Sequence, residues 1–277
     1  MKKIEQLLLK PLSKFPTLVQ HFISLEGEGG TIGRSALYIR TGTCNLRCTF
    51  CDTKFSVEGK EEFDITEITS RKYIELLKNT YSRDQRRQIT NLSITGGEPL
   101  LNLNYMDEII KNTLLAFPFI KNIIFETNGT MLSVESNCNL LLEKLKDFKD
   151  INFMLSISPK LVGITSYSAI KTDDEIIDIY RNIFKNYQNI LSDKFDVQIK
   201  FIHSRNLLEW NEVLMDVLFN EFCSFHSNQI LIMPFTPDKP LGKHKDFWEN
   251  SKKDAVQYSL RNFFRYSPRL HVDSNLD

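Results

Sequence analysis

The stretch that decides the fold runs from residue 36 to residue 53 and reads ALYIRTGTCNLRCTFCDT. Its first four residues, Ala36 to Ile39, form an apolar run that predicts a buried β-strand. Polar residues and Gly42 follow directly and end the strand. Three cysteines then come at a C-x3-C-x2-C spacing, at Cys44, Cys48 and Cys51. The sequence therefore places three thiols in a loop at the carboxyl end of a strand.

Short apolar runs of the same kind recur along the chain and alternate with longer amphipathic stretches. The runs that predict further strands are 92–94, 122–125, 152–157, 197–202 and 229–233. The stretches that predict helices are 66–78, 105–116, 139–148, 173–187, 207–222 and 247–264. Strands that alternate with helices of this length predict βαβ units and a parallel sheet.

The number of these units predicts the fold class. Six units are fewer than the eight that close the common α/β barrel, so we expect an α/β fold with a partial (β/α)6-type barrel. No linker rich in Pro, Gly or Ser divides the chain, which favours a single domain over residues 1–277. In such sheets chemistry gathers at the carboxyl ends of the strands, so we expect the site in the loops behind them.

The composition excludes several classes of protein. The 277 residues are 42% hydrophobic and 25% charged, which is typical of a globular chain and not of a disordered one. Lys plus Arg and Asp plus Glu both number 35, so the formal net charge is zero and nucleic-acid binding is not expected. The sequence contains neither a secretory signal nor an apolar window as long as a membrane span. We therefore expect a cytoplasmic protein without a nucleic-acid or membrane partner.

The three close cysteines are the strongest chemical feature of the sequence. Thiolates are soft ligands, which favours zinc or an iron–sulfur cluster. Structural zinc normally has four protein ligands, and the nearest histidine, His21, lies on the other side of the strand. An iron–sulfur cluster held by three cysteines keeps one iron open for another ligand. A chance grouping of structural thiols is the third alternative. Cys138 and Cys223 lie in helical patterns and are expected to be buried free thiols.

Two further motifs flank the cysteines in sequence. Gly96-Gly97-Glu98-Pro99 follows a predicted strand; adjacent glycines allow close approach to a ligand, and a glutamate can accept bonds from an ammonium group. Residues 24–34 read SLEGEGGTIGR, and Arg40 ends the next strand, where it could bind an acid group in a bidentate way. Taken alone, Gly96-Gly97 is more simply an ordinary turn before a helix, and the segment 24–34 is equally consistent with a solvated Gly-rich turn in which Arg40 pairs with a neighbouring Glu.

Together, the three-cysteine loop and the Gly-Gly-Glu-Pro motif one βα unit later resemble the radical S-adenosylmethionine (SAM) enzymes. The resemblance implies a partial barrel of the radical SAM kind, with a cluster loop at 43–53. It also implies a [4Fe–4S] cluster held by Cys44, Cys48 and Cys51, whose open iron takes the amino and carboxylate groups of SAM. Reductive cleavage of SAM then yields methionine and a 5′-deoxyadenosyl radical.

Further matches resemble the 7-carboxy-7-deazaguanine synthase family. They are S-L-x-G-E-G from Ser24, Cys51 to Thr53, Thr95 to Pro99, Glu126 to Thr130, Ser158 to Leu161, Gln198-x-Lys200 and Met233-Pro234. The resemblance implies a lyase that converts 6-carboxy-5,6,7,8-tetrahydropterin to 7-carboxy-7-deazaguanine, a queuosine precursor. The radical would abstract hydrogen at C6, and ring contraction and loss of ammonia would follow.

The same resemblance implies roles for individual residues. Pterin contacts would be Leu25, Glu26, Gly27, Arg40 and Thr95, and SAM contacts would be Phe50, Asp52, Gly97, Glu98, Ser158, Lys160 and Lys200. Thr53 would bind a magnesium ion, a cation that prefers oxygen ligands. An external reductant such as flavodoxin and a homodimer are implied as partners.

The chain departs from that family at three places. Glu26 stands where the family usually has Gln; an amide can donate and accept, whereas an ionised carboxylate only accepts and would repel a substrate carboxylate. The segment from Arg269 to Asp277 lacks the proline that touches substrate in the family, so the C-terminal contact stays unassigned. Residues 1–18 form an N-terminal extension.

Two other functions fit part of the pattern. A radical SAM activase that generates a glycyl radical on a partner protein would share the three-cysteine loop. A non-catalytic scaffold would hold zinc or a cluster through the same cysteines without turning over SAM. The scaffold ranks last because it does not require the Gly-Gly-Glu motif.

Overall fold

The computed structural model describes residues 17–48, 51–58, 66–68, 70–160, 173–203, 208–222, 225–236 and 245–274. Its centre is one nine-stranded sheet with the order β3-β1-β2-β4-β5-β6-β7-β8-β9. The strands are β1 (Thr17–Leu25), β2 (Ser35–Thr41), β3 (Thr66–Glu67), β4 (Asn91–Gly96), β5 (Asn122–Thr127), β6 (Asn152–Ile157), β7 (Phe195–His203), β8 (Ile230–Pro234) and β9 (Arg265–Tyr266).

Seven strands are parallel to one another: β2, β4, β5, β6, β7, β8 and β9. Strand β1 pairs antiparallel with both β2 and β3. Within the described part of the chain, β3 and β9 are the two ends of the sheet, so the barrel is open. The expected α/β fold with a partial parallel barrel is confirmed.

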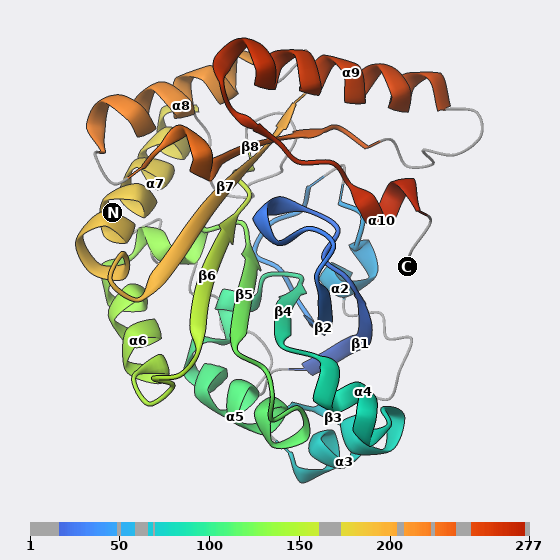
Figure 1. The fold of residues 1–277 in the computed structure, drawn as a ribbon. Helices are drawn as coiled ribbons and strands as arrows, with labels where there is room; N and C mark the ends of the chain where they lie inside the picture. The colour runs from blue at the N-terminus through green and yellow to red at the C-terminus, as the bar shows by residue number, and fades with distance from the viewer. Residues whose placement is uncertain are drawn as a thin grey trace.

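Most helices cover the outside of the curved sheet, whereas α10 (Leu270–Asp273) lies beside the opening of the barrel (Figure 1). The other helices are α2 (Lys54–Glu58), α3 (Arg71–Thr80), α4 (Arg83–Gln88), α5 (Met106–Ala116), α6 (Glu135–Leu145), α7 (Asp173–Asn186), α8 (Leu208–Glu221) and α9 (Lys245–Asn262). Helix α5 shows why: Met106, Ile109, Ile110 and Thr113 are fully buried and follow the three- and four-residue spacing of one helix face. Cys138 of α6 is a fully buried free thiol, as expected, whereas Cys223 lies outside the described residues.

All six predicted strands are present, and each predicted helical stretch contains a helix. The predicted helix at 66–78 is wrong in its first residues. Thr66 and Glu67 form β3, and the helix begins only at Arg71. Thr17 and Leu18, the last residues of the expected N-terminal extension, are the first residues of β1. None of the described helices combines the length and apolar character needed to cross a bilayer.

The topology brings two kinds of segment into the interior of the open barrel. The carboxyl ends of β2, β4, β5, β6, β7 and β8 all lie at one edge because these strands are parallel. The opening loop, which we define as residues 26–34, begins at the other edge, where Leu25 pairs with Ser35 at the start of β2. Figure 1 shows this loop in the middle of the molecule, surrounded by the strands.

Candidate functional site

One cavity of about 260 Å³ lies where these segments meet. Most of the residues predicted from the sequence line it: Leu25, Glu26, Gly27, Arg40, Cys44, Cys48, Cys51, Asp52, Thr53, Thr95, Gly97, Ser158, Lys160 and Lys200. Two predicted residues do not: Phe50 lies outside the described residues, and Glu98 is buried behind the cavity wall. The lining also includes side chains that the sequence did not single out, among them Phe22, Tyr38, Arg269 and His271.

The three thiols all face this cavity from the loop behind β2. The chain turns at Thr43, whose positive φ of 67° is uncommon for a residue with a side chain. The backbone N–H of Leu46 donates to Cys44 Sγ over 3.4 Å, and burial raises the pKa of the Cys44 thiol to about 12. The loop is tied to the end of β5, because Asn45 donates to Thr130 and accepts from Asn128.

The three thiols are a soft donor set of the kind that holds an iron–sulfur cluster. Across the described ranges, no group of three or more His, Cys, Asp or Glu side chains is arranged to hold a single metal ion. In a cluster each thiolate binds its own iron, so the three sulfurs need to surround a shared volume, and here all three line one cavity. Cys44, Cys48 and Cys51 are therefore the residues that would hold such a group.

The two glycines at the end of β4 pack against the cluster loop itself. Gly97 N–H donates to the carbonyl of Thr41 over 3.0 Å, and Glu98 N–H donates to that of Thr43 over 2.8 Å. A Cβ on Gly97 would lie 1.7 Å from the Thr43 carbonyl oxygen, so no larger residue fits there. The motif therefore holds the backbone from which the first cysteine projects, besides lining the cavity.

The Glu98 carboxylate is used within the protein. One oxygen accepts from the Thr127 hydroxyl over 2.6 Å and from Leu100 N–H over 3.1 Å, and the other accepts from Asn128 N–H over 2.8 Å. Burial nevertheless raises the pKa of Glu98 to about 7. Its side chain thus fixes the end of β5 beside the cysteine loop, and the expected ammonium contact stays a prediction.

Glu26 is the most deeply buried carboxylate of the cavity wall, with 2% of its surface exposed. Its Oε2 accepts from the Tyr38 hydroxyl over 2.8 Å, while no described group hydrogen-bonds Oε1. Burial, and next the charge of Glu126, raise the pKa of Glu26 to about 7. The side chain therefore offers the cavity one oxygen that changes from donor to acceptor near neutral pH.

Arg40 supplies a cation at the same end of the cavity. Its guanidinium carbon lies 5.2 Å from the ring centroid of Phe22, and Phe22 is stacked on Tyr38 at 4.9 Å. Its buried Nε has no hydrogen-bond partner among the residues that the structure describes. The alternative in which Arg40 pairs with a neighbouring Glu is not seen among these residues, and Nε is free to bind an acid group of a ligand.

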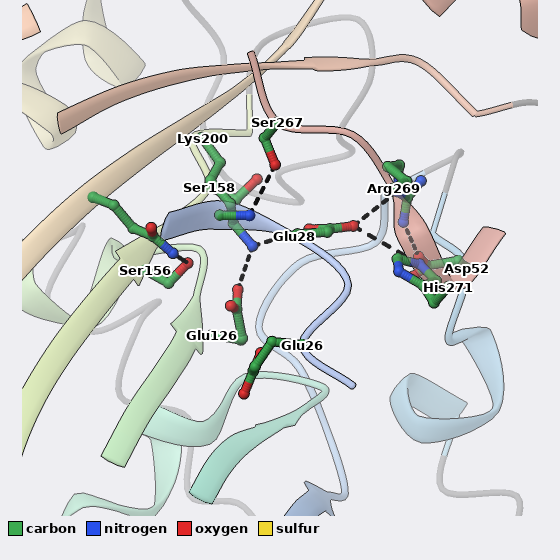
Figure 2. A network of polar contacts seen from close by, with 12 residues as sticks. Glu26, Glu28, Asp52, Glu126, Ser156, Ser158, Lys200, Ser267, Arg269 and His271 are labelled. Atoms are coloured by element: carbon green, nitrogen blue, oxygen red, sulfur yellow. Dashed lines mark hydrogen bonds and ion pairs between the residues drawn. The ribbon is translucent and has the colours of Figure 1, made fainter. Parts of the chain in front are cut away.

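Lys200 joins two carboxylates in the interior (Figure 2). Its Nζ lies 3.0 Å from Glu28 Oε2 and 2.5 Å from Glu126 Oε2, and the residue is only 2% exposed. Burial would lower the pKa of Lys200, but Glu126 and Glu28 raise it above its usual range. The ammonium is therefore charged and largely committed to these two glutamates.

The segment after β9 closes one side of the cavity. Arg269 pairs with Glu28 and with Asp52, and the imidazole of His271 packs so closely on Gly27 that a Cβ there would lie 2.2 Å from Nδ1 (Figure 2). Burial lowers the pKa of His271. The sequence assigns no contact to this segment, because no local pattern identifies an arginine whose partner, Glu28, lies 241 positions away.

The remaining predicted residues lie around the carboxyl ends of the strands. Lys160 Nζ donates to Ser158 Oγ over 2.9 Å, behind β6. Thr53 Oγ1 lies 3.5 Å from the Gly96 carbonyl oxygen and 3.7 Å from Cys51 Sγ. The structure thus brings the predicted cluster, cofactor and substrate residues that it describes to one place, Glu98 excepted.

Comparison with known proteins assigns the chain to a family. The family model of the radical SAM superfamily matches residues 38–190, which include the three cysteines, the Gly-Gly-Glu-Pro motif and β6. The chain belongs to the radical SAM superfamily. The resemblance predicted from the cysteine loop is therefore confirmed.

Curated relatives of this radical SAM protein include several 7-carboxy-7-deazaguanine synthases. The one from Clostridium acetobutylicum is 29% identical over 153 residues, which are 53% of this chain and 63% of that protein. The chain therefore covers less than two thirds of this relative. The one from Halobacterium salinarum is 25% identical over 258 residues, 91% of this chain and 87% of that protein. A GTP 3′,8-cyclase from Clostridium botulinum is 28% identical over 251 residues, 79% and 73% of the two chains.

A solved structure shares the fold. QueE from Escherichia coli superimposes with a TM-score of 0.53 at 15% identity, over 92% of this chain and 94% of that one. This likeness supports the radical SAM fold.

Proposed function

We propose that this radical SAM protein is a carbon–nitrogen lyase that converts 6-carboxy-5,6,7,8-tetrahydropterin to 7-carboxy-7-deazaguanine and ammonia. The observation that carries the proposal is that one cavity is lined by the three cysteines and by the opening loop with Arg40. The similarity to 7-carboxy-7-deazaguanine synthases along most of the chain supports the same reaction.

The cavity residues suit this substrate at its two ends. Arg40, with a free buried donor, would bind the C6 carboxylate. Glu26 and Thr95 would hydrogen-bond the polar ring, which carries both N–H donors and carbonyl acceptors. The ring would lie within the barrel between the opening loop and the cluster loop.

The cofactors supply the radical chemistry. A [4Fe–4S] cluster with SAM provides a 5′-deoxyadenosyl radical when bound and reduced. The residues of this chain would hold and orient the partners: Asp52, Gly97, Ser158, Lys160 and Lys200 would lie along SAM, and Thr53 would bind magnesium. The reaction needs no net oxidant, because the pterin loses only ammonia.

Partners and location follow from the same proposal. We expect an external one-electron reductant such as flavodoxin, a homodimer, a cytoplasmic location and one domain over residues 1–277.

The similarity to a GTP 3′,8-cyclase names a second candidate substrate. GTP shares the aminopyrimidinone edge of the pterin but carries a triphosphate. The charged residues of the cavity wall are four carboxylates (Glu26, Glu28, Asp52 and Glu126) and four cations (Arg40, Lys160, Lys200 and Arg269). A balanced wall favours a single carboxylate over a group with several negative charges.

The test is an anaerobic assay of the reconstituted protein. Iron, sulfide, dithionite, magnesium and SAM are supplied with either 6-carboxytetrahydropterin or GTP, and products are followed by mass spectrometry. We expect 7-carboxy-7-deazaguanine in excess over 5′-deoxyadenosine, together with loss of product when magnesium is omitted. A protein with Cys48→Ala, which lacks one of the three thiolates, serves as the inactive control.

Other outcomes separate the alternatives. Release of 5′-deoxyadenosine without a deazapurine would keep the radical chemistry and reject the substrate. A product from GTP would favour the cyclase. A protein that binds a cluster but never cleaves SAM would support the non-catalytic scaffold.

A further inference from the structure

The segment from Arg265 to Ser274 is fixed along one side of the cavity. Ser267 N–H donates to the Ile232 carbonyl over 2.9 Å, and Ser267 Oγ accepts from Gly29 N–H over 2.8 Å. Leu270 N–H donates to the Gly27 carbonyl over 2.9 Å. This segment is therefore attached to both β8 and the opening loop, and Arg269 lies between the two attachments.

The Arg269 guanidinium contacts three different parts of the chain. Nε donates to Glu28 Oε1 of the opening loop over 2.8 Å, and Nη2 donates to Asp52 Oδ2 of the cluster loop over 2.7 Å. Nη1 donates to Thr236 Oγ1, behind β8. The side chain is 13% exposed, and Figure 2 shows it between the two loops.

These contacts use the planar shape of arginine. Each of the three nitrogens has a different acceptor, and the two carboxylates belong to segments that are not otherwise adjacent in sequence. A lysine ammonium is a single point and cannot span the same acceptors in one plane. The guanidinium also neutralises part of the charge of these two carboxylates.

The geometry points to a coupling role: we propose that Arg269 is a positioning residue that fixes the opening loop relative to the cluster loop. The inference rests on the proposed function, in which the opening loop holds the substrate and the cluster loop holds SAM. Arg269 then helps to set the distance between the C6 hydrogen of the substrate and the radical carbon, because its side chain contacts both loops.

The experiment replaces the bridge while keeping its charge. With Arg269→Lys we expect kcat for product to fall roughly 10- to 100-fold, because a displacement of about 1 Å between reacting groups has that effect. SAM cleavage is expected to continue, so the amount of 5′-deoxyadenosine per product rises well above that of the unmodified protein. An unchanged ratio of 5′-deoxyadenosine to product in Arg269→Lys would overturn the proposal.

The matched control is Lys252→Ala. Lys252 of α9 holds the far end of the same segment through Asp273, over 3.1 Å, and does not line the cavity. The Lys252→Ala variant should leave the ratio of 5′-deoxyadenosine to product unchanged. An equal rise of this ratio in Lys252→Ala would show that any loosening of the segment from Arg265 to Ser274 has the same effect. That result would overturn the specific role of Arg269.

A second measurement does not depend on the substrate. Hydrogen–deuterium exchange of the reconstituted protein without substrate should show faster exchange at residues 26–30 and 51–56 in Arg269→Lys, but not in Lys252→Ala. If the unmodified protein makes no deazapurine, the proposed function fails while this result still supports the bridge. Unchanged exchange in both loops would overturn the bridge even if the enzyme makes the deazapurine.

Discussion

Glu26 is a buried carboxylate of the cavity wall whose charge depends on pH. Its carboxyl is faced by Tyr38 of β2, Glu28 of its own loop, Glu126 of β5 and Lys200 of β7. Below its pKa of about 7 the neutral carboxyl can donate and accept, as the amide of glutamine does. Above it, a buried negative charge would oppose the substrate carboxylate.

We therefore predict that Glu26→Gln changes the pH profile. In the unmodified protein, kcat/KM for 6-carboxytetrahydropterin should fall by up to about tenfold per pH unit above pH 7, as the neutral form is lost. In Glu26→Gln the part of this fall that Glu26 causes should be absent between pH 6.5 and 8.5. Glu98, whose pKa is also about 7, is present in both proteins, so the difference between the two profiles isolates Glu26. Parallel profiles would refute the explanation.

Individual site residues could be predicted from the sequence where they belong to a motif of residues adjacent in the chain. The cysteines and the Gly-Gly-Glu-Pro motif are contiguous patterns, and Arg40 follows a recognisable strand. Arg269 and His271 have no such pattern, because their partners Glu28 and Gly27 are more than 240 positions away. The structural use of Glu98 was also missed, since its acceptor role depends on how β4 and β5 lie beside each other.

At the scale of elements, the end of β4 and the loop behind β2 form one unit. Where Gly97 approaches Thr43, Gly97 N–H donates to the Thr41 carbonyl and Glu98 N–H donates to the Thr43 carbonyl. The motif that the sequence analysis interpreted as a ligand contact is thus also a packing contact between two loops.

We predict that Gly97→Ala impairs assembly of the cluster. The added methyl group would overlap the Thr43 carbonyl, so the cysteine loop has to move. Iron and sulfide content after reconstitution, and the visible absorbance of the cluster, should fall by more than half. Gly33→Ala is the control: it adds strain at a positive φ of 82° but meets nothing within 4 Å, so it should cost about 1 kcal/mol of stability and leave iron content unchanged. Full iron content in Gly97→Ala would contradict the packing role.

Strand prediction depended on how deeply each strand is buried. The six predicted strands carry apolar runs in the sheet interior, whereas β1 reads TLVQHFISL with a mostly half-buried pattern and no regular alternation. The two-residue strands β3 and β9 are too short to produce a signal. The first residues of the predicted helix at 66–78 became β3 because they pair with Thr17 and Leu18.

At the scale of the whole molecule, a chain of ion pairs crosses the barrel interior. It runs from Asp52 through Arg269, Glu28 and Lys200 to Glu126. It connects the cluster loop, the C-terminal segment, the opening loop, β7 and β5 (Figure 2). Burial would raise the pKa of Glu28, but Lys200 and Arg269 hold it below its usual range.

We predict that Lys200→Met destabilises the protein in a pH-dependent way. Loss of the ammonium leaves Glu126 without this cation and Glu28 with Arg269 and the nearby His271, which should cost about 3 kcal/mol at pH 7.5. An unpaired buried carboxylate has a raised pKa in the folded state, so the folded protein takes up a proton as pH falls. The loss of stability should therefore shrink at pH 5.5.

Urea unfolding of the metal-free protein under reducing conditions measures this difference. Lys252→Met, which removes a more exposed cation paired with Glu249 and Asp273, should cost less than about 1 kcal/mol at both pH values. An equal loss at pH 7.5 and pH 5.5 in Lys200→Met would show that lost packing, and not charge, is responsible.

The fold class followed from the sequence because every βα unit repeats the same local pattern. The position of the opening loop inside the barrel could not be predicted from the sequence. This loop enters from the edge opposite to the cysteine loop, and only the antiparallel pairing of β1 with β2 places it at that edge.

The late position of Arg269 in the chain has a consequence during protein synthesis. A ribosome that has translated through β8 has already produced all three cysteines, the two glycines and the opening loop. The guanidinium that links the two loops emerges only about 35 residues later, after α9. During synthesis the three thiols, the two glycines and the opening loop therefore all exist before the guanidinium that links the two loops has been made.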